Sequence, residues 1–337
     1  MHSVQFSEGR LLHFAEAFEK PASTPPIDAQ SDHPKEAQDI KKMSIDFARI
    51  IQAAQLEPFV NTAGILRGVI TTTKQELPSL NIDNLDGYSI EELQRFLAKA
   101  HSAEAIVFVV QVMMEHPDAP KAHDAVKPLL ENNDLSVYAA ALSYMMAHGR
   151  IDELPVHITN ANDMLANVLA TEGKLVQEYR TKVAARIQRA RETGEGQKSH
   201  LLIEKPDNSR DLFLQYSSLT AGYGAALRRE QDTLPQLRTI FQSSKNNGGL
   251  VSVGCELIKS GRFQELKDML VTSREESKRD ALIVALFQTM YLNDNPDQQA
   301  KSERGIIALC RELMVDSNTF SSTQKEFLKQ MSGGKEQ

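Results

Sequence analysis

One uninterrupted helical pattern constrains the fold of this chain more than any other feature of its sequence. Between Asn160 and Arg191 there is no proline, and apolar residues recur every three or four positions, which places them on one side of an α-helix. The apolar stripe consists of Leu165, Val168, Leu169, Val176, Tyr179, Val183 and Ile187. Such a helix is about 48 Å long, which exceeds the width of a small domain. The glycines in Thr193-Gly-Glu-Gly196 end it.

The segments on both sides of this helix also have helical patterns. Ser89-Ile-Glu-Glu92 fits a capping box at the N-terminus of one helix. Pro117 ends the next helix along the chain. Short polar turns such as residues 131–134 separate neighbouring segments, and no pair of alternating strands joined by a hairpin turn occurs. Helices joined by short turns pack as antiparallel neighbours. The sequence therefore predicts an all-α fold, with helical-hairpin, repeat-like modules around a long central helix pair.

Two predicted hairpins resemble one another in sequence. The seventeen residues that end at Leu154 align without gaps on those that end at Leu266, and both contain a Gly-Arg pair, which begins at Gly149 and at Gly261. A glycine just after a helix can take the left-handed C′ conformation, so each pair marks the end of one helix and the start of an antiparallel one. The pattern is similar to the inner turn of tetratricopeptide-like proteins, although the rest of that consensus is absent. It indicates either an internal duplication or two ordinary helical hairpins.

Changes in composition divide the chain into four parts. Residues 1–40 include a proline-rich polar stretch with little to bury, and we expect them to form a flexible, disordered N-terminal extension. Ordered structure is expected from Lys41 onward. We predict an N-terminal helical module over residues 41–158, a central long-helix hairpin over residues 159–248, and a C-terminal helical module with a polar tail over residues 249–337.

Charge and composition narrow the classes of function. The 337 residues carry 38 basic and 45 acidic side chains, a formal net charge of −7, so the overall field opposes binding to nucleic acid. The first twenty residues lack the apolar run of a Sec signal peptide, and the longest apolar stretch, Ala105 to Met114, has about half the length of a membrane span. Two cysteines are too few for a disulfide framework. These features predict a cytoplasmic protein without a membrane span, with export by a non-Sec route as the alternative.

No motif in the sequence predicts catalysis, a cofactor or a metal site. His116, His123 and Asp124 form the only compact group of candidate metal ligands, but Pro117 breaks the helix that would have to present both histidines on one face. Neither cysteine belongs to a Cys-x-x-Cys pair, and no nucleophile elbow or complete P-loop is present. We therefore expect no catalytic, cofactor-binding or metal-binding residues.

The strongest local charge lies at the far end of the long helix. Five cations occur within twelve residues, without an acidic side chain before Glu192. These candidate partner-binding residues are Arg180, Lys182, Arg186, Arg189 and Arg191. Three of them, at positions 182, 186 and 189, share one helix face. The geometry of the following helices decides whether Arg228, Arg229 and Arg238 enlarge the patch. Either this face binds an acidic partner, or it is a solvated helix end favoured by the macrodipole.

The fold class and the absence of catalytic motifs favour a non-catalytic protein–protein interaction scaffold or adaptor built from helical hairpins. Its expected partner is another protein, which could bind through an acidic surface. Two alternatives remain. The chain could be a secreted bacterial effector or a secretion-system regulator that acts by binding a partner protein. It could also be an α-helical enzyme whose site is assembled from residues that no spacing reveals. Nucleic acid is not the expected partner, because no exposed aromatic residues alternate with the basic ones.

Overall fold

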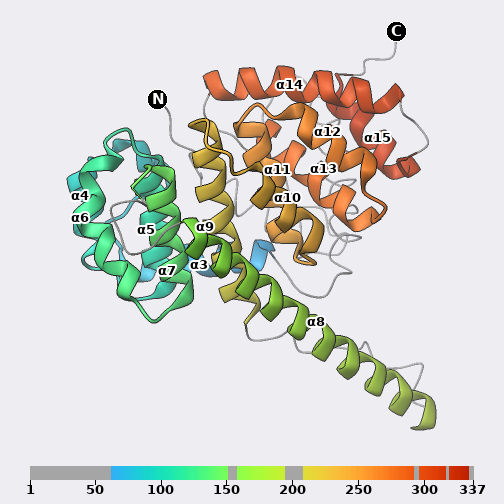
Figure 1. The fold of residues 1–337 in the computed structure, drawn as a ribbon, viewed down its shortest axis with the longest axis horizontal. Coiled ribbons are helices and arrows are strands. Elements are labelled where there is room, and N and C mark those ends of the chain that lie inside the picture. The colour runs from blue at the N-terminus through green and yellow to red at the C-terminus, as the bar shows by residue number, and fades with distance from the viewer. Residues whose placement is uncertain (1–61, 151–157, 194–207, 292–295, 316–318, 334–337) are drawn as a thin grey trace, which may run out of the picture.

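The protein is helical throughout the part of the chain that its structure describes. The computed structural model describes residues 62–150, 158–193, 208–291, 296–315 and 319–333. These ranges contain thirteen α-helices, α3 to α15, with three short 3-10 segments and no strand, which confirms the predicted all-α fold (Figure 1). The predicted flexible extension, residues 1–40, lies outside the described residues. None of the described helices combines the length and the apolar composition needed to cross a membrane.

Among the first helices, α4 begins and α5 ends where local signals in the sequence place them. They are α3 (Thr62–Glu76), α4 (Ile90–Leu97), α5 (Ala103–Glu115), α6 (His123–Val126) and α7 (Leu135–Ala147). The predicted capping box is present at α4, because the Ser89 backbone N–H donates to Glu92 Oε2 (2.8 Å) and the Glu92 N–H donates to Ser89 Oγ (3.3 Å). Helix α5 ends two residues before Pro117, as the sequence predicts.

The long helix and the helices after it make up the rest of the described chain. The long helix is α8 (Ile158–Thr193), and it is followed by α9 (Ser209–Arg228), α10 (Leu234–Ser243), α11 (Asn247–Lys259), α12 (Phe263–Thr272), α13 (Glu276–Tyr291), α14 (Pro296–Val315) and α15 (Ser322–Met331). The bounds of α8 exceed the predicted span of 160–191 by two residues at each end. At 36 residues, α8 is about 54 Å long, and its second half extends beyond the other helices (Figure 1).

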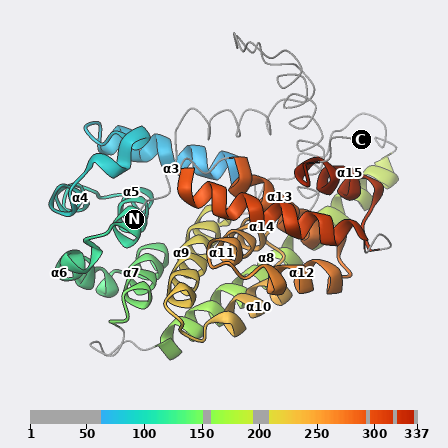
Figure 2. The same cartoon turned by 90° about the horizontal axis from the view of Figure 1, so that it is seen from above.

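The helices form two layers. Helices α5, α7, α9, α11 and α13 make a row in which each contacts the next, and Figure 2 shows α7, α9 and α11 side by side in this order. Helices α8, α10, α12 and α14 form the second layer, and each of them contacts two members of the row. Successive antiparallel hairpins that stack in this way are consistent with the repeat-like modules predicted from the sequence. The positions of the module boundaries stay a prediction.

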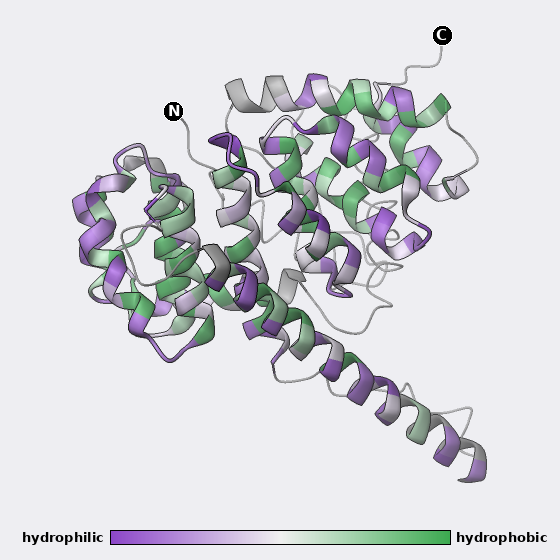
Figure 3. Ribbon diagram, viewed as in Figure 1, coloured by the Kyte–Doolittle hydropathy of each residue, from purple (hydrophilic) through white to green (hydrophobic). Residues whose placement is uncertain are grey.

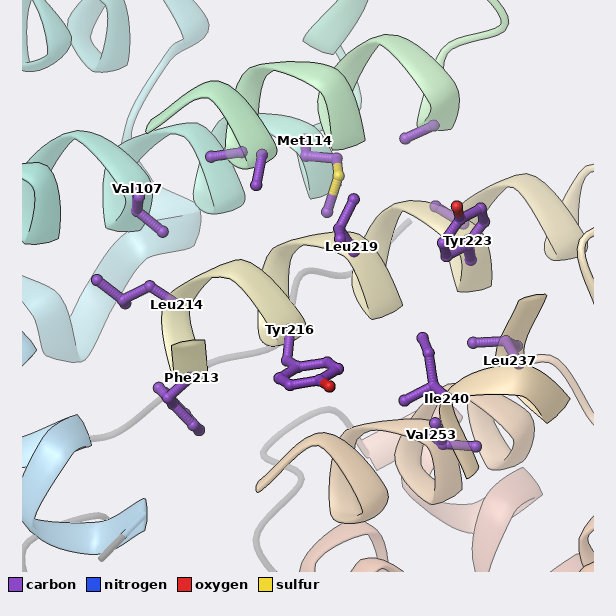
Figure 4. Packing of buried hydrophobic residues seen from close by; sticks show 14 of the residues in the cluster. Val107, Met114, Phe213, Leu214, Tyr216, Leu219, Tyr223, Leu237, Ile240 and Val253 are labelled. Carbon is purple, nitrogen blue, oxygen red and sulfur yellow. The ribbon is translucent and has the colours of Figure 1, made fainter. Parts of the chain in front are cut away.

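Helix α9 lies at the centre of the core. It is buried along nearly its whole length, and its buried residues include the polar Gln215, Ser218 and Thr220 as well as apolar ones. Leu219 points toward Met114, whereas Tyr216 points to the opposite side of α9, on which Ile240 and Val253 lie (Figure 4). The buried side chains from α3 through α15 form one continuous cluster. The helices on both sides of α9 therefore share a single hydrophobic core.

The two Gly-Arg pairs end their helices in the same way. Gly149 has a φ of +64° and Gly261 has a φ of +68°, which confirms the predicted left-handed C′ conformation. After α7, the Arg150 N–H donates to the Met145 carbonyl (3.0 Å), and after α11, the Arg262 N–H donates to the Leu257 carbonyl (2.8 Å). Both ends are thus Schellman motifs. Helix α12 restarts directly at residue 263, whereas the corresponding restart at residue 151 lies outside the described residues.

Candidate functional site

Helix α8 has two halves with different surroundings. Its first half, residues 161–179, which we name the root, packs against α7, α9 and α10 and contributes buried residues to the core. Among the side chains of α8 that the structure describes, the last to pack against the core is that of Tyr179, which is half-buried. From residue 180 to residue 193, which we name the arm, every side chain that the structure describes is exposed. Hydrophilic residues recur along the arm (Figure 3).

The arm results from a difference in helix length. Helix α8 has 36 residues, whereas its antiparallel neighbour α9 has 20 and α10 has 10. The antiparallel direction follows from two contacts, because Tyr223 donates to Asn162 near the start of α8 (3.0 Å) and Tyr216 donates to Glu172 near its middle. The neighbours of α8 end before the helix does, and the remaining four turns have no described helix against which to pack.

A buried carboxylate holds the root. Glu172 is 1% exposed and accepts hydrogen bonds from the Tyr216 hydroxyl, from Ser244 Oγ (3.2 Å) and from the backbone N–H of Lys245. Burial raises the pKa of this carboxyl, although the hydrogen bonds act in the opposite direction. The bonds join α8 to α9 and to the turn before α11. This network fixes the direction in which the arm leaves the body.

All five cations that the sequence singles out lie on the arm: Arg180, Lys182, Arg186, Arg189 and Arg191. The side chains of Arg180, Lys182 and Arg189 are exposed, and the other two are outside the described side chains. In the described part of the chain, no carboxylate forms an ion pair with Arg180 or with Lys182. The acidic residue at the tip, Glu192, accepts a hydrogen bond from Gln188 (3.0 Å). The binding role of these cations stays a prediction.

Arg228 and Arg229 do not enlarge the basic patch. They end α9, and α9 runs antiparallel to α8, so both lie near the start of α8 at the opposite end from the arm. Arg228 instead belongs to a partly buried ionic group, and Arg229 donates to Nδ1 of His148 (3.0 Å). The direction of the hairpin decides this, and the spacing of residues in the sequence does not reveal it.

Arg228 connects three helices through ion pairs. It donates to Glu256 on α11 (2.7 Å) and to Glu115 at the end of α5 (3.2 Å), and Lys259 also donates to Glu256 (2.9 Å). We name these four residues the Arg228 cluster. Gly224 permits the close approach of α9 and α11, because a Cβ atom at this position would overlap the Glu256 side chain. The sequence shows no sign of this cluster, because Arg228 and Glu115 are 113 positions apart.

Opposite charges keep the buried carboxylate of the Arg228 cluster ionised. Burial opposes the ionisation of Glu256, but the Lys259 ammonium and the Arg228 guanidinium outweigh this effect and hold the pKa of the carboxyl below its ordinary value. The same attraction raises the pKa values of Lys259 and Arg228 above theirs, against the effect of burial. Arg228, Lys259 and Glu256 therefore stay charged and paired with one another.

The nearby histidine and cysteine are also unsuited to catalysis. The Met114 carbonyl can only accept, so Nε2 of His148 donates to it (3.1 Å) and Nδ1 is the nitrogen that faces Arg229. Burial, together with the positive charge of Arg229, lowers the pKa of His148 to about 4. Burial raises the pKa of the Cys255 thiol to about 11. At neutral pH this histidine is neutral and this cysteine is a thiol rather than a nucleophilic thiolate.

The three residues weighed as metal ligands lie in different surroundings. Nδ1 of His116 accepts from the Asp118 backbone N–H (3.0 Å), and Nε2 lies 3.2 Å from the Tyr88 carbonyl. His123 is buried, whereas Asp124 is exposed. Among the described residues, no three His, Cys, Asp or Glu side chains are placed to hold a metal ion together, and both cysteines are free thiols.

A small hollow lies at the N-terminus of α11. It has a volume of about 160 Å³ and is lined by Ser244, Lys245, Asn247, Leu250, Glu275, Ser277 and Lys278. Sites for small molecules usually have volumes of roughly 300 to 1,000 Å³. Its lysines are already paired, because Lys245 donates to Glu275 (2.8 Å) and Lys278 donates to the Gln242 carbonyl (2.7 Å). The hollow therefore offers neither the volume nor the unpaired charge of a ligand site.

Comparisons with known proteins give no relative from which a function could be inferred. No family model matches the chain, and neither the curated proteins nor the solved structures contain a significant match.

Proposed function

We propose that this protein is a non-catalytic interaction scaffold or adaptor, and that the arm is the element that contacts its partner protein. The overhang of α8 carries this proposal. Fourteen residues of a continuous helix extend past the neighbouring helices, and every described side chain on them is exposed. A polar helix outside a core gains no stability from burial, so its persistence in a fold is best explained by a contact with another molecule.

The arm is suited to this role by its composition. Residues 180–191 are mainly Arg, Lys, Ala and Gln, which have high intrinsic helix propensity. The arm also continues a helix that the root has already nucleated, which removes the main cost of helix formation. A partner would therefore meet a preformed surface, and little conformational entropy would be lost on binding.

The chemistry of the body supports a non-catalytic role. The charged side chains of the Arg228 cluster are paired, His148 is neutral at neutral pH, and the Cys255 thiol is protonated. Catalytic acids, bases and nucleophiles need pKa values close to the working pH. These three groups are therefore better explained as parts of the packing between helices.

The cellular location belongs to the same proposal. A scaffold of this kind is expected in the cytoplasm. A secreted effector or a secretion-system regulator would also act by binding a partner protein, so that alternative uses the same arm and differs in the compartment in which it acts. Fractionation of the native cell, with detection of the chain in the culture medium and in the cytoplasm, distinguishes the two.

Site-specific photo-crosslinking in the native cell tests the role of the arm. We would replace Thr181, which is exposed on the arm, with a photo-crosslinking amino acid. The matched control is the same replacement at Lys127, which is exposed on the N-terminal helices. A partner held by the arm gives a discrete adduct from position 181 that is absent from position 127.

Affinity purification with washes at low and at high salt gives the stoichiometry of that adduct partner. The proposed scaffold is supported if the protein retained in stoichiometric amounts is the same protein that is crosslinked at position 181. The same diffuse adducts from positions 181 and 127, with nothing retained at stoichiometric amounts, would contradict it.

A further inference from the structure

We propose that the partner of the arm is an acidic polypeptide segment that lies along the face formed by Lys182, Arg186 and Arg189. This inference rests on the proposed function, because it names the chemistry of the partner that the arm would hold. The argument uses the charge of the arm, the position of its cations along the helix and the charge of the rest of the molecule.

The arm is a concentrated positive charge on a negative molecule. Residues 180–191 contain five cations and no carboxylate, which gives this segment a charge of +5. The formal net charge of the whole chain is −7, so the other residues together carry −12. Arg180 and Lys182 are exposed and form no ion pair with a carboxylate in the described part of the chain. This surface therefore attracts negative charge close to the arm, while the body repels it.

The helix macrodipole does not account for the first cations of the arm. The stabilisation of positive charge by a helix C-terminus falls off within the last turn. Helix α8 ends at Thr193, so Lys182 lies eleven residues, or about three turns, before the end. Arg180 lies still further from it. The first cations of the arm therefore gain little from the helix end, and a complementary surface explains them better.

The spacing of the cations defines the size of the complementary segment. Positions 182, 186 and 189 follow the spacing i, i+4 and i+7, which places them on one face over about 10 Å. The full set from 180 to 191 covers about 16 Å. A helix with carboxylates at the same spacing, or about five residues of extended chain, has the matching length. An arginine guanidinium group can bind a carboxylate with two hydrogen bonds.

The charge of the body distinguishes a short acidic segment from other anions. A long nucleic acid or an anionic membrane would extend past the arm and meet the field of the negatively charged body. The described arm also lacks aromatic side chains on which bases could stack. Two arms from two copies would repel each other. A short acidic stretch of polypeptide reaches the arm without these penalties.

A peptide titration tests the inference. The probe is a labelled twelve-residue peptide of eight glutamates and four alanines. The control is the same peptide with glutamine in place of glutamate. Binding is measured by fluorescence anisotropy at about 20 mM and at about 300 mM salt, because screening weakens exposed charge pairs. We expect the wild-type protein to bind the glutamate peptide at least tenfold more tightly than the glutamine peptide, and only at low salt.

Two protein variants assign the binding to the arm. The first reverses the face (K182E/R186E/R189E), and the second reverses three exposed cations elsewhere (K99E/K127E/R238E) and changes the net charge equally. We expect the first variant to lose at least tenfold in affinity and the second to stay within threefold. Circular dichroism confirms that both variants keep their helix content, and neutral substitutions (K182Q/R186Q/R189Q) replace the first variant if it loses helix. Equal affinity of the face variant and the wild type overturns the inference.

Further outcomes separate this inference from the proposed function. If the adduct from position 181 persists in the face variant, the arm binds a partner, but the inference that this partner is an acidic segment is wrong. If the glutamate peptide binds while no partner is crosslinked in the cell, the proposed scaffold fails although the arm can hold acidic chains. Tighter binding of an eight-nucleotide uridine RNA or of anionic vesicles, or self-association in sedimentation at the same concentrations, also overturns the inference.

Discussion

The root and the arm belong to one helix, yet different forces determine their side chains. In the root, Leu165 and Val168 are buried, and Glu172 is satisfied by three hydrogen-bond donors. In the arm, Lys182 and its described neighbours are exposed. The helix continues across the boundary because backbone hydrogen bonds are local. Side chains are no longer buried beyond this boundary because the neighbouring helices end. A regular helix by itself therefore does not show which of its residues pack against the rest of the fold.

Charged groups show the same contrast. The Arg228 cluster is enclosed by helices, and its members are paired with one another. On the arm, Arg180 and Lys182 are exposed to solvent, which screens their charges and reduces their effect on stability. The body should therefore be sensitive to any change that leaves a buried charge unpaired, whereas the arm should tolerate charge changes without loss of stability. The following predictions test this difference, from the largest expected effect to the smallest.

Neutralising Glu256 should cause the largest loss of stability. Glu256→Gln leaves Arg228 and Lys259 without their shared counter-charge in a mostly buried site, and breaking such a group costs about 3 to 5 kcal/mol. Urea unfolding followed by circular dichroism measures the change. Glu192→Gln, the matched change at the exposed tip of the arm, should alter the free energy of unfolding by less than about 0.5 kcal/mol. Equal effects of the two substitutions would show that the contrast between body and arm is wrong.

A core substitution in the root should have the next largest effect. Leu165 is 3% exposed, and Leu165→Ala removes buried methyl groups and leaves a cavity, at a cost of about 2 to 4 kcal/mol. The same urea titration applies. Gln188→Ala on the arm removes a comparable number of atoms from an exposed position and should change stability by less than about 0.5 kcal/mol. A small loss from Leu165→Ala would mean that the root is not fixed in the core.

Asp280 gives the body a dependence on pH that the arm lacks. Burial raises the pKa of Asp280 to about 6, although Gln324 donates a hydrogen bond to it (2.6 Å). Because the folded state keeps this proton to a higher pH than the unfolded state, its contribution to stability is present below about pH 4 and is lost as the pH rises through about 6. The linked free energy is at most about 3 kcal/mol.

Asp280→Asn tests this linkage. Asparagine can still accept the hydrogen bond from Gln324 but carries no charge. Relative to wild type, the variant should gain stability at pH 7 and show no gain at pH 4. Urea unfolding at both pH values measures the difference. A gain that is the same at pH 4 and at pH 7 would exclude titration of Asp280 as its cause.

Neutral substitutions in the arm should have the smallest effect on stability. Arg180 and Lys182 are exposed and far from the helix end, so replacing both with alanine, the best helix former, should change the free energy of unfolding by less than about 0.5 kcal/mol. The thermal midpoint and the helix content measure this directly. A loss above 1 kcal/mol would show that these cations stabilise the fold and would remove the reason to assign them to a partner.

Local signals in the sequence predicted several details of the structure. The capping box at Ser89, the left-handed glycines at positions 149 and 261, and the span of α8 depend on residues within a few positions of one another. The Arg228 cluster and the bonds to Glu172 could not be predicted, since their members come from helices that are distant in sequence. Gly224 gives no signal either, because only the proximity of α11 makes a glycine necessary there.

The sequence by itself determined that this chain is helical, that one helix is much longer than the others and that positive charge gathers at its end. These properties follow from periodicity, capping and composition, which act over a few turns of chain. Only the tertiary structure decided which half of α8 is buried, that Arg228 pairs with Glu115 and Glu256, and that the arm extends away from the body (Figure 1). These outcomes depend on the lengths and directions of neighbouring helices, because burial is a property of the packed assembly and not of any single segment.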